Sequence, residues 1–209
     1  MGVLVSGRGT NLEALLRASR DETFPAGVVI VISNRHDAPA LQVAREWEVD
    51  ASAMPVSNFD GDSASRDRTM LERLRVAGVE LVVCAGYDRI LSDEFIRAFP
   101  DAILNVHPSL LPAFAGTMQA VEDALAYGVA VTGCTVQLLA HGEVDGGPVV
   151  LQAAVAIEPD DDAEALRRRI HAQEWRLLPA AVALWSEGRL RRNGRRVTIL
   201  PAAPALRRA

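Results

Sequence analysis

Short runs of apolar residues alternate with longer amphipathic segments through the first half of the chain, and this alternation restricts the fold more than any other feature. Residues 2–7 and 27–34 form two such runs, and residues 11–20 between them place leucines on one helical face. Uninterrupted apolar runs are typical of parallel strands covered on both faces. Further strands are expected at 51–56, 80–86 and 102–107, and further helices at 38–47, 63–77 and 93–99. The pattern predicts an α/β fold with a Rossmann-like, mostly parallel sheet and helices on both faces.

The pattern changes after Pro112. Residues 119–127 have helical periodicity, and two long apolar runs at 129–139 and 148–157 are separated by a short glycine-rich loop. Long strands joined in this way are expected to pair antiparallel. A long helix is expected at 162–184, because the acidic residues that open it suit the positive end of a helix. The chain is therefore expected to form one domain, 1–209, whose two parts, 1–100 and 101–209, share a sheet.

The C-terminal segment RLRRNGRRVTIL is rich in arginine. Asn193 and Gly194 stand between two short runs, which is a strong signal for a β-hairpin. The arginines can be interpreted as a phosphate-binding patch or as the solvated edge of the hairpin. The second interpretation is favoured, because charged edges keep sheets from pairing with other chains.

Composition and charge exclude several classes of protein. The chain of 209 residues is 49% apolar and has a formal net charge of −5, so sequence-independent binding to nucleic acid, which depends on excess Lys and Arg, is not expected. No run reaches the roughly 18 apolar residues of a membrane span, and the N-terminus lacks the pattern of a secretory signal. Cys84 and Cys134 lie in apolar runs without metal-ligand spacing. These features predict a cytoplasmic protein with no bound metal and no membrane partner.

The segment SGRGTN follows the first expected strand and opens the first expected helix. Glycines there allow a sharp turn that brings backbone N–H groups close to an anion, and the helix dipole favours negative charge. The third glycine of the dinucleotide fingerprint is missing, because Leu12 stands in its place. The segment therefore predicts a site for a mononucleotide or sugar phosphate. The alternative is a tight strand-to-helix turn with Thr10 as the N-cap.

Asn105 and His107 stand two residues apart at the end of an expected strand, so their side chains point to the same face. Ligands of open α/β sheets bind at this carboxyl edge. An amide donor beside an imidazole can hold a carbonyl oxygen as negative charge develops on it. A lone histidine is more often structural, but its pairing with Asn105 favours a functional role.

Asp145 lies in the glycine-rich segment EVDGGPV, where an aspartate is commonly a turn residue. A functional role is favoured by the need of His107 for a partner that fixes its tautomer and orientation. Ser109 is near this group, but nothing forms a nucleophile elbow around it. The three polar residues therefore suggest direct transfer without a covalent enzyme intermediate.

The segments SGRGTN, AGYDRIL, LNVHPSLLPAF, VTGCTVQ and EVDGGPVVLQ resemble those of glycinamide ribonucleotide formyltransferases and occur in the same order. The resemblance extends from Val3 to about Leu190, and the length matches the bacterial single-function type. It implies the formyltransferase fold and transfer of a formyl group from 10-formyltetrahydrofolate, a co-substrate, to the amine of glycinamide ribonucleotide in purine synthesis. It also implies no metal, and the protein is expected to be a monomer or a homodimer.

The resemblance implies a role for each candidate residue. Asn105 and His107 would hold the formyl oxygen, and Asp145 would orient His107 and help to remove the amine proton. The remaining residues would contact the phosphate, the rest of the ribonucleotide, or the folate. They are Gly9, Thr10 and Asn11 for the phosphate; Glu174 and Thr135 for the ribonucleotide; and Arg89, Ile90, Leu91, Ala140, His141, Gly142, Glu143 and Val144 for the folate.

Several positions differ from the usual family pattern. Gln137 and Trp175 each stand where the family commonly has histidine, and Ala115 replaces the proline of a common F-P-G. The loop that contains residues 140–144 is one residue longer than usual. A family arginine near the helix at 63–77 has no clear match, with Arg66 or Arg68 as candidates. These differences concern substrate affinity more than reaction type.

Four other functions fit the sequence less well. A formyltetrahydrofolate deformylase carries an additional N-terminal regulatory domain, whereas this sequence starts at its first strand. Methionyl-tRNA formyltransferase has a C-terminal tRNA-binding domain, where this sequence has only a short arginine-rich hairpin. A non-catalytic nucleotide-binding protein is disfavoured by the set of Asn105, His107 and Asp145. A nicotinamide-dependent oxidoreductase is disfavoured by the missing third glycine and by Asn34, which stands where a ribose-binding acid is expected.

Overall fold

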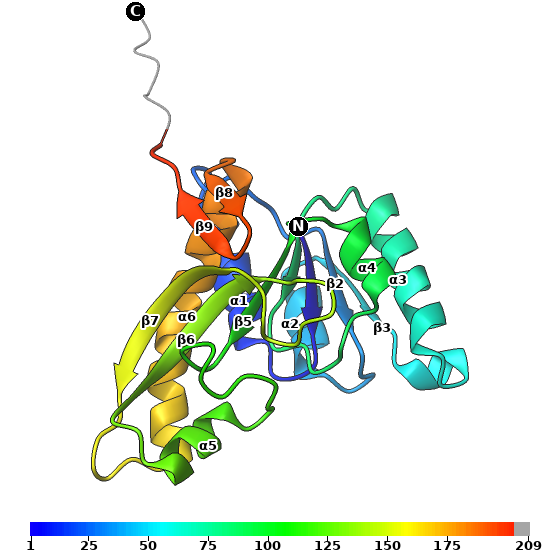
Figure 1. Cartoon of the computed structure of the whole chain (residues 1–209). Helices are drawn as coiled ribbons and strands as arrows, with labels where there is room; N and C mark the ends of the chain where they lie inside the picture. The colour runs from blue at the N-terminus through cyan, green and yellow to red at the C-terminus, as the bar shows by residue number, and fades with distance from the viewer. Residues whose placement is uncertain (203–209) are drawn as a thin grey trace, which may run out of the picture.

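The computed structural model describes residues 1–202, which form a nine-stranded sheet in the order β3-β2-β1-β4-β5-β6-β7-β9-β8 (Figure 1). Strands β1 to β5 are parallel, β6 is antiparallel to both β5 and β7, and β8 is antiparallel to β9. The predicted mostly parallel sheet with antiparallel strands in its C-terminal part is confirmed. The strands are β1 (Gly2–Val5), β2 (Ile30–Ser33), β3 (Asp50–Ala53), β4 (Val82–Cys84), β5 (Ile103–His107), β6 (Val131–Leu138), β7 (Val149–Ala156), β8 (Leu190–Asn193) and β9 (Arg196–Ile199).

Helices cover both faces of the sheet, as predicted (Figure 1). One face carries α1 (Thr10–Ala18), α2 (Pro39–Glu46) and α6 (Ala163–Ser186), and the other carries α3 (Ser63–Val76) and α4 (Asp93–Ala98). Helix α5 (Ala120–Tyr127) packs beside α6. Across residues 1–202, no helix has the length and apolarity needed to cross a bilayer.

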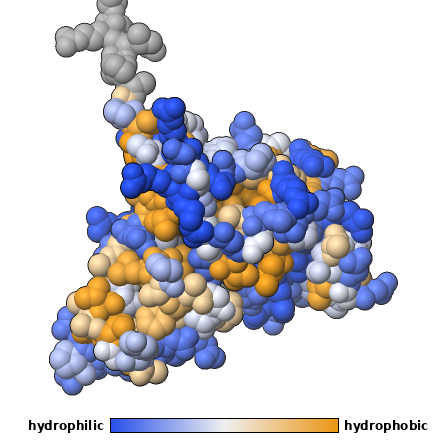
Figure 2. All heavy atoms as spheres, viewed as in Figure 1, coloured by the Kyte–Doolittle hydropathy of each residue, from blue (hydrophilic) through white to orange (hydrophobic). Residues whose placement is uncertain are grey.

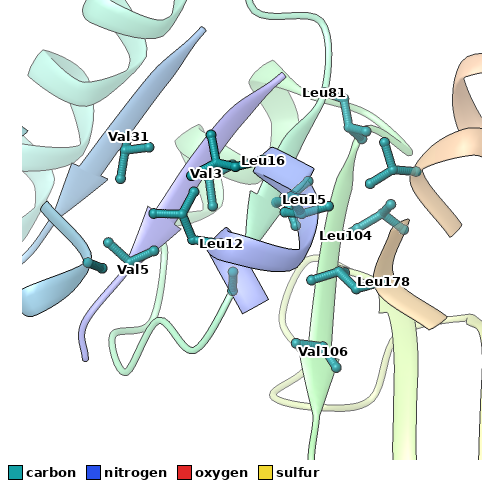
Figure 3. Packing of buried hydrophobic residues seen from close by; sticks show 14 of the residues in the cluster. Val3, Val5, Leu12, Leu15, Leu16, Val31, Leu81, Leu104, Val106 and Leu178 are labelled. Atoms are coloured by element: carbon teal, nitrogen blue, oxygen red, sulfur yellow. The ribbon is translucent and has the colours of Figure 1, made fainter. Parts of the chain in front are cut away.

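The alternation of side chains along β1 divides the core into two layers. Val3 and Val5 face α1, where they meet Leu12 and Leu15 (Figure 3), and Leu4 packs in the opposite layer. All five side chains are fully buried. Since burial of one such side chain stabilises a fold by roughly 1.5–3 kcal/mol, this packing fixes α1 on the sheet and with it the loop that precedes the helix.

All seven strands expected from apolar runs are shorter in the structure than predicted, and the shortening of those at 27–34 and 51–56 has a plain cause. Gly2 pairs with Ile30, so residues 27–29 lie before the start of this pairing, where Met1 bonds to Val29 and Gly27 without forming a ladder pair. The strand expected at 51–56 ends at Ala53, because Pro55 has no N–H for the ladder and a 3₁₀ helix, η1 (Val56–Phe59), follows it. The hairpin predicted around Asn193 and Gly194 is confirmed.

Gly133 on β6 tests the tight packing of the antiparallel part of the sheet. A Cβ atom at this position would lie 2.0 Å from the carbonyl oxygen of Ala153 on β7, whereas a Cβ at Gly27 would meet nothing within 4 Å. We expect Gly133→Ala to lower the free energy of unfolding by about 2 kcal/mol or more, because backbone must shift to admit the methyl group. Urea unfolding should show this loss, with Gly27→Ala near wild type. Equal stability of the two variants would contradict the packing described.

Candidate active site

A large cleft opens at the carboxyl ends of β1, β4 and β5. Its volume is ≈ 550 Å³, which is within the range of small-molecule sites. Its wall includes the loop that follows β1, the loop that joins β6 to β7, and one face of α6. Both halves of the chain therefore build this cleft, and the boundary between 1–100 and 101–209 does not divide it.

Asn105, His107 and Asp145 meet in this cleft, as predicted from their positions in the sequence. The Nδ1 atom of His107 lies 3.3 Å from Oδ2 of Asp145. The side-chain amide of Asn105 donates to Oδ1 of Asp145 over a long 3.5 Å. Residues 105 and 107 share one face of β5, and the β6–β7 loop brings the carboxylate to them across a sequence separation of about 40 residues.

The Asp145 carboxylate accepts from two further groups that sequence reasoning did not find. The backbone N–H of Gly116 donates to Oδ2 at 2.9 Å, and the side chain of Gln137 donates to Oδ1 at 3.2 Å. Gln137 is fully buried, and its own oxygen accepts the N–H of Gly147 at 3.1 Å. Asp145 has φ 50°, a left-handed conformation that non-glycine residues adopt rarely and that surrounding contacts must hold.

The imidazole of His107 is held on both sides. Its Nε2 atom lies 2.9 Å from the carbonyl oxygen of Phe114, opposite the contact between Nδ1 and Asp145. A carbonyl oxygen only accepts, so Nε2 carries a proton in this geometry, and Nδ1 also donates when the ring is an imidazolium. The ring therefore stands with one nitrogen directed at a carboxylate.

No group of three His, Cys, Asp or Glu side chains within residues 1–202 is placed to hold a metal ion.

The loop after β1 presents the start of α1 to the cleft. Helix α1 begins at Thr10 with Gly9 as its N-cap and no capping bond from a side chain, so the interpretation of Thr10 as N-cap is wrong. Gly9, Thr10 and Asn11 all line the cleft. The first N–H groups of a helix lack intrahelical partners, so this end of the cleft suits an anion.

One face of α6 lines the same end of the cleft with Arg167, His171 and Glu174. Glu174 is buried and accepts a hydrogen bond of 2.8 Å from the side chain of Asn11. Burial raises the pKa of Glu174, and the Asn11 bond opposes the rise. Burial also lowers the pKa of His171, and the charges of Arg8 and Arg167 lower it further. Sequence reasoning named only Glu174, although the spacing i, i+4, i+7 places all three residues of α6 on one helical face.

The expected folate-binding residues divide into two groups. Arg89, Ile90 and Leu91 line the cleft, as do Glu143 and Val144. Ala140, His141 and Gly142 do not line it, so their contact with the folate stays a prediction. His141 turns away to α4, where its Nε2 lies 2.7 Å from Oδ2 of Asp93.

Thr135 and the two candidate arginines lie outside the cleft wall. The hydroxyl of Thr135 is fully buried: it donates to the carbonyl of Ser109 at 2.7 Å and accepts from the N–H of Leu111 at 3.0 Å. Thr135 therefore holds the turn after His107 and does not line the cleft, and its contact with the ribonucleotide stays a prediction. Arg66 is buried in a pair with its neighbour Asp67, and Arg68 lies in a separate shallow groove.

The chain belongs to the formyl transferase family, because the family model of that description matches residues 1–182. It is 38% identical over 191 residues to the phosphoribosylglycinamide formyltransferase of Haemophilus influenzae, covering 91% of this chain and 89% of the relative. It is 41% identical over 195 residues, 92% of its length, to the trifunctional purine biosynthetic protein adenosine-3 of Drosophila pseudoobscura pseudoobscura, of which it spans 14%. The structure of glycinamide ribonucleotide transformylase 1 from Symbiobacterium toebii matches with a TM-score of 0.92 at 48% identity, covering 96% of this chain and 93% of that one. The family resemblance and the fold are thereby confirmed.

Glu174→Gln tests the burial of this carboxyl. Because its folded-state pKa is raised above the ordinary 4.5, the stability it contributes is present below that pH and is lost as pH rises through the folded value. Glutamine keeps an oxygen for Asn11 and cannot ionise, so the variant should unfold at a higher temperature than wild type at pH 7. The difference should shrink towards pH 4. Parallel stability profiles between pH 4 and pH 8 would show that Glu174 is not held in this way.

Proposed function

We propose that this chain transfers the formyl group of 10-formyltetrahydrofolate to the amine of glycinamide ribonucleotide, releasing formylglycinamide ribonucleotide and tetrahydrofolate. The observation that carries the proposal is the meeting of Asn105, His107 and Asp145 in one cleft whose far end is the start of α1. The names of the relatives point to the same reaction. Membership of the family supports folate as the formyl donor.

The two ends of the cleft differ in a way that suits the two substrates. At one end, the N–H groups of residues 9–11 suit the phosphate, and Glu174, which lines the same end, would accept from a ribose hydroxyl. At the other end, Arg89, Ile90 and Val144 offer a partly apolar wall, with Ile90 and Val144 exposed, that suits a flat heterocycle. The catalytic residues lie where a ligand at one end would meet a ligand at the other.

The reaction follows from these positions. The substrate amine attacks the formyl carbon, and negative charge develops on the formyl oxygen. Asn105 can donate to this oxygen, because its contact with Asp145 is long and easily exchanged, and an imidazolium at His107 stabilises the charge. Asp145 accepts the proton that the attacking amine loses, directly or through water. The bond between the formyl carbon and N10 of the folate then breaks as the carbonyl reforms, and N10 takes up the proton that Asp145 received, directly or through water.

A formyl-transfer assay with and without glycinamide ribonucleotide tests the proposal. Conversion of 10-formyltetrahydrofolate to tetrahydrofolate only in the presence of the ribonucleotide is the expected result. Conversion without it would identify a deformylase, and no conversion in either mixture would support a non-catalytic binding protein.

Asp145→Asn separates catalysis from binding. The amide cannot accept the amine proton, so the turnover number should fall by about 100-fold or more, whereas calorimetry should show ribonucleotide affinity within a few-fold of wild type. Asp50→Asn, an exposed aspartate paired with Arg73 away from the cleft, is the control. Loss of ribonucleotide affinity with little change in turnover at saturation would make Asp145 a binding residue instead.

A further inference from the structure

The arginine-rich hairpin of β8 and β9 contacts the loop that carries Asp145. The guanidinium group of Arg195 donates from Nη1 to Oε2 of Glu143 at 2.9 Å and from Nη2 to the carbonyl oxygen of Gly146 at 2.6 Å. Hydrophilic residues gather over this hairpin (Figure 2), and its turn lies beside the β6–β7 loop (Figure 1). One side chain thus holds the loop on both sides of Asp145.

The sheet itself places Arg195 at the loop. Strand β9 joins β7 in parallel where Arg196 pairs with Val149, the first residue of β7. The loop ends immediately before Val149, and Arg195 immediately precedes Arg196, so both approach the same point of the sheet. A guanidinium can bond two acceptors with its planar fork of donors, which suits a carboxylate and a carbonyl side by side.

The segment that Arg195 contacts is tightly folded. A Cβ atom at Gly146 would lie 2.5 Å from Oε2 of Glu143, so the Glu143 side chain is folded back over the glycine. Gln137 holds the same loop from its buried side, through Asp145 and Gly147. The left-handed conformation of Asp145 is therefore held from the inside by a buried amide and from the outside by Arg195.

Arg195 is not part of the cleft wall, so it does not supply the phosphate-binding patch that the sequence left as an alternative. Its side chain is 72% exposed, and exposed ion pairs contribute little to global stability. The contact is therefore suited to shift the population of one loop conformation and not to hold the fold together.

We propose that Arg195 is a positioning residue: from the C-terminal hairpin it holds the 143–146 turn so that Asp145 stays directed at His107. Its kinetic consequence rests on the proposed transfer reaction, whereas the ordering of the loop does not. Arg195 acts through the loop and touches no substrate.

Kinetics of Arg195→Ala test the catalytic consequence. We expect kcat to fall about fivefold, the effect of one exposed ion pair, with the KM of glycinamide ribonucleotide unchanged. Arg191→Ala is the matched control, because Arg191 is an exposed arginine on the same hairpin whose side chain makes no hydrogen bond within residues 1–202. Unchanged kcat would overturn the proposal. A rise confined to the KM of the folate would also overturn it, because Arg195 would then be a ligand-binding residue.

Hydrogen exchange tests the ordering of the loop without any substrate. Amides of residues 143–147 should exchange several-fold faster in Arg195→Ala than in wild type and in Arg191→Ala, with thermal midpoints alike. The double variant Arg195→Glu with Glu143→Arg swaps the two charges, and it should regain part of the exchange protection that Arg195→Ala loses. Equal exchange in all variants would overturn the proposal, even if the wild-type chain transfers the formyl group. If the wild-type chain does not transfer the formyl group but Arg195→Ala exchanges faster, the loop contact is established and the proposed function is wrong.

Discussion

The site depends on one carboxylate that must stay directed at its donors. Asp145 accepts hydrogen bonds from Asn105 on β5, Gln137 on β6 and the backbone N–H of Gly116, and it faces the His107 ring. A carboxylate this little exposed requires such partners, because burial without them would cost several kcal/mol. Three separate segments are thereby fixed relative to one another, and a strained residue at φ 50° is kept in place.

The change from parallel to antiparallel pairing makes this convergence possible. Strand β6 runs back along β5 so that Asn105 pairs with Gln137 and His107 with Thr135. Strand β6 therefore ends beside Leu104, at the amino end of β5, and the β6–β7 loop folds back towards the cleft so that Asp145 reaches Asn105 and His107. The start of α1 supplies the anion-binding end of the same cleft, because α1 is packed on β1 through a fully buried leucine face.

Much of the fold and the central residues were predictable because their signals are local. Apolar runs identify strands, and the two-residue spacing of Asn105 and His107 places both on one face. Gln137 as a donor to Asp145 was not predictable, since that contact depends on the cross-strand register of β5 and β6. The same holds for Thr135, whose hydroxyl is used by the 109–111 turn, and for His141, which turns to α4. Residues 203–209 of the expected domain lie outside the described part of the chain.

The most direct test of the central claim is a crystal structure of the chain with glycinamide ribonucleotide and a folate analogue that cannot release a formyl group. We predict the substrate amine within hydrogen-bond reach of the Asp145 carboxylate, roughly 3 Å or one water away, the formyl-equivalent oxygen facing the Asn105 amide, and the phosphate at the N–H groups of residues 9–11. An amine remote from Asp145, or a formyl-equivalent oxygen directed away from Asn105 and His107, would contradict the proposed arrangement of catalytic groups.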